Sequence, residues 1–229
     1  MVNKKIMNSA DKFRPQDFSM EISKITADPK IQAHIQEAIN SILKDRNLPI
    51  EVTIPDNLVE GGEMLTVGLV GFSDLEADQV EESRMFIETV FRALLKRYPN
   101  NQINLISGLT DYGIPSLGYS TAKALNIVNR NIQWKLIGIA PAVAEAKDDP
   151  CQIFPVDEKH IKGEKWGEDS EFFVNSVKHI LIKVGGGYQA NHEADELRKR
   201  GVIIIEYKLQ IKKELLDNWR KKKNSIFTK

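Results

Sequence analysis

Cysteine, histidine and long apolar runs are scarce in this chain, and each scarcity excludes a class of protein. Cys151 is the single cysteine among 229 residues, so no intrachain disulfide can form and a reducing compartment is favoured. The four histidines and the one cysteine form no group with the spacing of metal ligands, so we expect no metal. No apolar run approaches the roughly 18 residues of a membrane-spanning helix, and no apolar core of a secretory signal follows Met1 to Lys5. We therefore expect a cytoplasmic protein without a membrane partner.

An excess of charge of one sign is also missing, because 32 Lys and Arg balance 32 Asp and Glu. Non-specific binding of nucleic acid needs a strong positive field, so we expect no nucleic-acid partner. The run from Arg220 to Lys223 is a local exception, which we interpret as a solvated basic tail. A hydrophobic content of 41% and a charged content of 28% are ordinary for a globular protein.

The chain divides into three parts on its local patterns. Residues 1–62 form an N-terminal appendage, loosely ordered over about the first 20 residues, with one amphipathic helix at about 29–44 that Asp28 caps and Pro29 begins. Residues 63–208 form the main domain, and residues 209–229 form a C-terminal basic helix or tail. The length fits one domain with such additions.

The main domain alternates short apolar runs with helix-forming segments. Five runs read as buried strands, at 65–71, 103–106, 134–139, 179–184 and 202–206. Ser73 and Glu76 have the spacing of a capping box for a long helix, and further helices are expected at 119–128 and 190–200. Residues 152–156 are a candidate for another strand. This alternation predicts an α/β fold, a Rossmann-like parallel sheet sandwiched between helices.

The most informative segment is Gly185-Gly186-Gly187, which ends the apolar run from His179 to Val184 and precedes a helix. A glycine turn between a strand and a helix leaves backbone N–H groups open to a ligand, and the helix dipole adds partial positive charge there. This pattern predicts a binding site for an anion, most often a phosphate. Small residues also follow two other predicted strands, and we expect them at the same cleft: Gly71 and Ser73, and Gly108 and Thr110.

The residues after the turn resemble the signature P-G-G-x-G-T-x-x-E of the Lonely Guy proteins, once called lysine decarboxylases, within the SLOG superfamily. Gly186, Gly187 and Glu193 match in register, whereas Gly185, Gln189 and Ala190 replace the proline, the last glycine and the threonine. The resemblance covers about residues 64–207. It implies a Rossmann-like nucleotide-binding fold and a homo-oligomer, since these proteins are typically dimers.

The resemblance also implies an activity, cleavage of the base–ribose bond of nucleoside 5′-monophosphates with Glu193 as the catalytic carboxylate. The family pairs this glutamate with an arginine on the preceding helix, but the aligned position here is Glu171-Phe172 and no arginine lies between Arg130 and Arg198. Lys162, Lys165 and Lys178 are the candidate replacements, although a lysine lacks the forked donors of an arginine.

Several of these residues also have an ordinary structural interpretation. Glu193 suits a solvent-facing position near a helix start, and Glu196 fits an i,i+4 ion pair with Arg200. Tyr188 is a candidate to cover a base, with Gln189 and His192 as further contacts. Three hypotheses follow: a nucleotide-binding protein needing no cofactor, a phosphoribohydrolase, and a non-catalytic scaffold whose nucleotide site is vestigial.

Overall fold

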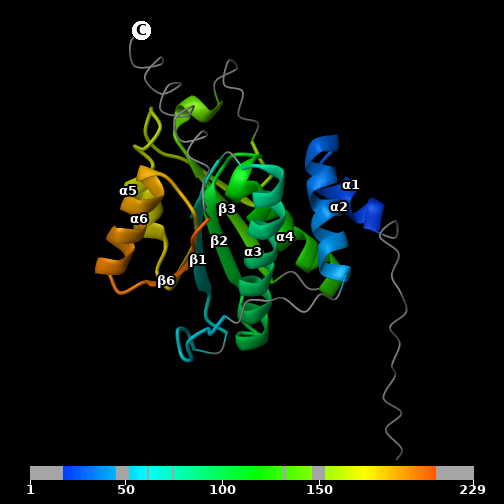
Figure 1. Ribbon diagram of the computed structural model, residues 1–229, viewed down its shortest axis with the longest axis horizontal. Helices are drawn as coiled ribbons and strands as arrows, with labels where there is room; N and C mark the ends of the chain where they lie inside the picture. Colours follow the sequence, from blue (N-terminus) through cyan, green and yellow to red (C-terminus); the bar gives the residue numbers. More distant parts are fainter. Residues whose placement is uncertain are drawn as a thin grey trace, which may run out of the picture.

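The computed structural model describes residues 18–44, 52–60, 62–73, 75–130, 133–145 and 153–209. Six parallel strands form one sheet in the order β4-β3-β2-β1-β5-β6, with helices on both faces (Figure 1). The elements, in chain order, are α1 (Ser19–Ile25), α2 (Pro29–Leu43), β1 (Leu65–Gly71), α3 (Ala77–Arg97), β2 (Ile103–Gly108), α4 (Gly113–Asn129), β3 (Trp134–Ala140), the 3-10 turn η2 (Ala142–Glu145), β4 (Glu158–Ile161), α5 (Ser170–Ser176), β5 (Ile180–Val184), α6 (Tyr188–Lys199) and β6 (Ile203–Tyr207). The predicted α/β, Rossmann-like fold is therefore confirmed.

The two faces of the sheet carry separate helical layers. Alternate residues of the central strands, such as Leu65 and Leu69 in β1, pack with α2, α3 and α4 in the larger core. Val70, Ile106 and Leu181 point the other way and pack with α5 and α6 in a second core. Because both faces are covered, β1, β2 and β5 are buried over almost their whole length, which explains their continuous apolar sequences.

The predicted amphipathic helix of the N-terminal part is confirmed as α2. The Oδ1 atom of Asp28 accepts hydrogen bonds from the backbone N–H groups of Lys30 and Ile31, and Pro29 occupies the first helical position. Ile35 and Ile39 are fully buried in the same core as the residues of α3 and α4. Helix α1, which precedes α2 and packs against it, was not predicted from the sequence.

Two predicted helix starts are wrong. The predicted Ser73–Glu76 capping box does not form: α3 begins at Ala77 with Glu76 as its N-cap, which forms a capping box with Gln79, while Ser73 is exposed in the preceding loop. Helix α4 begins at Gly113, six residues before the predicted Tyr119. The first turn of a helix tolerates a proline, so Pro115 lies within the first turn of α4 and does not interrupt it.

The segment after β3 also differs from its prediction. Within the described residues, Ile153 forms a single bridge to Thr110, and the strand of this region is β4, farther along in a stretch that looked polar. Cys151, Asp74, the first 17 residues and the basic tail beyond 209 lie outside the described residues, as does nearly all of the predicted C-terminal helix. Among the helices that are described, none has the length and apolar character needed to span a membrane.

Candidate functional site

The carboxyl ends of β1 and β5 lie side by side at the point where the chain changes faces. After β1 the chain passes to α3 on one face, and after β5 it passes to α6 on the other (Figure 1). Ligands of doubly wound sheets bind at such a switch point. Gly71, at the end of β1, pairs in register with Val184, and a Cβ atom on Gly71 would lie 2.3 Å from the Val184 carbonyl oxygen. The structure therefore brings the predicted turns at 71–73 and 185–187 together.

The three glycines of the turn differ in backbone conformation and in their contacts. Gly185 and Gly186 have φ angles of +60° and +113°, which side chains disfavour, so they set the direction of the turn. The Gly185 N–H already donates to the Tyr207 carbonyl at 2.8 Å, and the Phe72 ring lies against this glycine. Gly185 thus shapes the turn, and its amide is not available to a ligand.

The N-terminus of α6 is the open part of the site. Gly187 is the N-cap in extended geometry and provides no side-chain bond, and a Cβ atom placed on it would meet nothing within 4 Å. The first helical bond runs from the Asn191 N–H to the Gly187 carbonyl, so the N–H groups of the first turn have no acceptor within the helix. The space beside Gly187, next to these groups, is open.

Two exposed rings stand on the first turns of α6. Tyr188 is 80% exposed, and its ring lies parallel to that of His192, with 6.3 Å between centroids and 4° between planes. Both residues were predicted contacts, and the structure places them beside the open amides. They place two exposed, polarisable rings on the first turns of this helix.

Glu193 lies in a different environment from the one its predicted role requires. Its carboxylate is buried between α6 and α5, and Oε1 accepts from the Ser170 hydroxyl at 2.6 Å and from the Gln189 amide at 2.9 Å. Burial raises the pKa of Glu193, and the neighbouring Asp169 carboxylate raises it further. Gln189, another predicted contact, is therefore bonded to Glu193. In this arrangement the glutamate joins the two helices.

The predicted second glycine region is filled largely by the chain itself. Gly108 ends β2 with Pro115 3.7 Å from the position of a Cβ atom, and the Thr110 hydroxyl donates to the Tyr112 carbonyl. Gly113, with a φ of +63°, packs against the backbone of Phe72 and Ser73. These contacts join the loop after β1 to the start of α4.

A buried cation that the sequence prediction missed is Lys183. Its side chain is 8% exposed on the α6 face of β5, and its ammonium group contacts the Glu206 carboxylate at 2.6 Å. In the sequence, the feature that could have pointed to Lys183 is its charge within an apolar strand, two positions before the glycines. Sequence alone could not name its partner, because that depends on the register of β5 against β6.

None of the lysines proposed as replacements for the family arginine lies on α5, the helix that precedes β5. Lys178 precedes β5, at the opposite end of that strand from the glycine turn, roughly 17 Å away for a five-residue strand. The Lys162 ammonium lies 4.7 Å from the centre of the Phe172 ring. Lys165 is exposed in the loop whose backbone N–H groups bond Glu168. The predicted ion pair of Glu196 with Arg200 is wrong as well: Glu196 pairs with Lys199, and Arg200 donates to Asn175 on α5.

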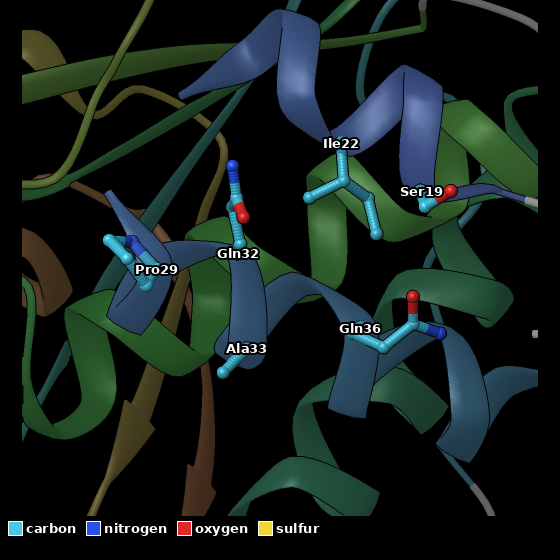
Figure 2. Close-up of a pocket in the computed structure, with 6 residues that line it drawn as sticks. All are labelled: Ser19, Ile22, Pro29, Gln32, Ala33 and Gln36. Atoms are coloured by element: carbon cyan, nitrogen blue, oxygen red, sulfur yellow. The ribbon is translucent and has the colours of Figure 1, made fainter. Parts of the chain in front are cut away.

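A separate groove of about 270 Å³ lies between α1 and α2, on the side of the molecule away from α5 and α6 (Figures 1 and 2). No charged side chain is among its lining residues, which are Ser19, Ile22, Pro29, Gln32, Ala33 and Gln36. It therefore lacks the groups that would recognise a phosphate. No cluster of three or more metal-binding side chains occurs among the described residues.

Comparisons with known proteins add little beyond the fold. No protein-family model matches the chain, and no curated protein matches it. Among solved structures it is similar to the molybdenum cofactor carrier protein MCP from Chlamydomonas reinhardtii, with 15% identity and a TM-score of 0.41 over 62% of this chain and 76% of that one. At that distance the likeness does not bear on what this chain binds. Membership of the SLOG superfamily, the oligomeric state and the compartment stay predictions.

Proposed function

We propose that this protein binds a small phosphate-bearing metabolite of the nucleotide class, with the phosphate at the N-terminus of α6. The observation that carries the proposal is the open first turn of α6, without a side-chain cap, at the switch point between β1 and β5. Backbone N–H groups and the helix dipole favour an anion at such a position.

The surroundings of the turn favour the rest of a nucleotide. Tyr188 and His192 expose parallel rings beside the open amides, and a base can stack on such a surface. The start of α3, across the switch point, carries Glu76 and Asp78 and suits hydroxyl groups better than phosphate. We therefore expect the phosphate at α6 and the sugar toward the loop after β1.

We propose binding without turnover. Hydrolysis of the base–ribose bond would need a carboxylate in contact with the sugar or with the attacking water. The Glu193 carboxylate is 4% exposed and accepts hydrogen bonds from Ser170 and Gln189. This environment supports a structural role for Glu193.

The test is a titration of the full chain with AMP, ADP, NAD and inorganic phosphate, followed by calorimetry and by thermal melts. A ligand at one hundred times its Kd stabilises the folded state by about 2.7 kcal/mol, which raises Tm by about 5–11 °C for a protein of this size. Chromatography of the same mixtures measures released base, and none is expected. The proposal fails if no phosphate compound binds, and release of base would overturn the non-catalytic assignment.

A further inference from the structure

Lys183 and Glu206 form a largely buried ion pair beside the proposed site. The two residues face each other in the register of β5 and β6, and both point to the face covered by α5 and α6. The Lys183 side chain is 8% exposed, whereas that of Glu206 is 32% exposed. The carboxylate therefore sits at the outer side of the pair and the ammonium at the inner side.

The lysine runs beneath the first turn of α6. Its Cε atom lies 3.9 Å from the point where a Cβ atom of Gly186 would be, and the Cβ of Ala190 lies 2.6 Å from the same point. The missing side chain of Gly186 thus makes room for both the lysine stem and the helix. The glycine that sets the direction of the turn also leaves space for the end of the lysine stem beneath it.

The electrostatics of this arrangement are unusual for a purely structural pair. A cation near a helix N-terminus is unfavourable, because the end of the helix is itself partly positive. The exposed carboxylate is the first anion available to balance Lys183, and Arg198 and Lys208 also act on it. An anion at the α6 N-terminus would interact favourably with both the amides and the ammonium.

We propose that Lys183 is a phosphate-binding residue whose ammonium exchanges Glu206 for the phosphate when the ligand binds. This inference rests on the proposed function and deepens it by naming the ligand class, a phosphate monoester. A monoester carries about two negative charges at neutral pH and can accept from the amides and the ammonium together. A cyclic phosphodiester carries one charge and gains less from this second donor.

A structural role makes different predictions from a binding role. If the pair only holds the edge strand β6, removing either partner lowers stability and leaves ligand affinity unchanged. If Lys183 binds phosphate, removing Glu206 removes its competitor and tightens binding. The two roles therefore differ in the sign of the effect of one substitution.

The experiment is calorimetric titration of AMP and cyclic AMP into the wild-type chain, Glu206→Gln and Lys183→Met. Glu206→Gln should bind AMP about three- to tenfold more tightly, and Lys183→Met at least about tenfold more weakly. The preference for AMP over cyclic AMP should fall in Lys183→Met. The matched control is Lys135→Met, which breaks a lysine–glutamate pair between β3 and β4, toward the opposite edge of the sheet, and should leave AMP affinity unchanged.

Thermal melts of each variant separate binding from folding. AMP should raise the Tm of Glu206→Gln more than that of the wild type, because the phosphate replaces the missing partner of a buried cation. The proposal is overturned if the wild type binds AMP while Glu206→Gln binds it equally or more weakly. It is also overturned if Glu206→Gln cannot fold, since the carboxylate would then be unable to release the lysine. If AMP does not bind the wild type while another phosphate compound of the earlier titration does, the inference is overturned and the proposed function stands. If no phosphate compound binds, the proposed function itself is refuted.

Discussion

Replacing Gly187 by aspartate would place a carboxylate at the N-cap of α6, where we propose that the phosphate binds. Gly187 has φ −87° and ψ −156°, which an aspartate adopts readily, and its Cβ position has no neighbour within 4 Å. The new side chain can therefore accept the first-turn N–H groups without disturbing the fold. It would act as an intramolecular competitor for the ligand.

The substitution should raise stability and lower affinity at once. A better N-cap contributes a few tenths of a kcal/mol over glycine, and a negative charge near the helix start contributes about 0.3–1 kcal/mol more. The gain corresponds to about 1–4 °C in Tm. In binding, two unit charges about 4 Å apart repel by about 4 kcal/mol near a protein surface, and half of that would weaken binding by roughly thirtyfold.

The assay pairs a melt without ligand with calorimetric titration of AMP, for Gly187→Asp and for Gly187→Ala as the matched control. Alanine caps poorly, so this control should lose about 0.5–1 kcal/mol of stability while the amides stay open and AMP affinity stays within about threefold. Our reasoning is refuted if Gly187→Asp binds AMP as tightly as the control does. A loss of affinity in both variants alike would show that a Cβ atom, and not the charge, blocks the ligand.

Three further predictions concern the fold around the site. Because burial raises the pKa of Glu193, this group favours the folded state below its ordinary pKa, and that contribution is lost as pH rises through the folded-state pKa. Glu193→Gln should thus be more stable than the wild type at pH 8 and lose this advantage at pH 4, and a pH-independent difference in Tm would contradict the burial argument. Ile35→Ala should lower the free energy of unfolding by about 2–5 kcal/mol in a single urea transition, whereas separate melting of α2 would show that this helix is not part of the core. Gly113→Ala should cost more than Gly62→Ala, because both have positive φ but only the Cβ at 113 would lie 2.5 Å from the Phe72 carbonyl, and equal urea midpoints would contradict this contact.

Five of the six strands could be predicted because each is an apolar run that ends in small or polar residues, whereas β4 lies in a polar stretch. Helix α2 could be predicted because Asp28 and Pro29 mark its start locally. The start of α4 could not, since Gly113 and Gly118 read as a loop. A Cβ atom on Gly118 would lie 2.0 Å from the Cδ2 methyl of Leu69, so the glycine lets the helix lie close to β1 with Leu69 in its present position. Packing between distant segments overrode local propensity at this helix.

The candidate site, too, has parts that the sequence predicts and parts that it does not. The turn at 185–187 and its position beside Gly71 followed from the order of strands and glycines. The burial of Glu193 depends on α5 packing against α6, and the pairing of Lys183 with Glu206 depends on strand register. Neither is visible in one sequence. Side chains near a predicted turn are thus predicted less well than the backbone of the turn itself.

The charges around the switch point support placing the proposed phosphate at the start of α6 and not at the start of α3. Helices α3 and α6 both begin at this edge, and each dipole favours an anion. At α3 the chain supplies its own anions, because the Glu76 carboxylate caps the helix and Asp78 lies in the first turn. At α6 the cap is a glycine, the first turn carries no acidic residue, and a buried lysine lies beneath it. The chain thus neutralises one helix start internally and leaves the other positive, which is the asymmetry that a ligand with a phosphate at one end requires.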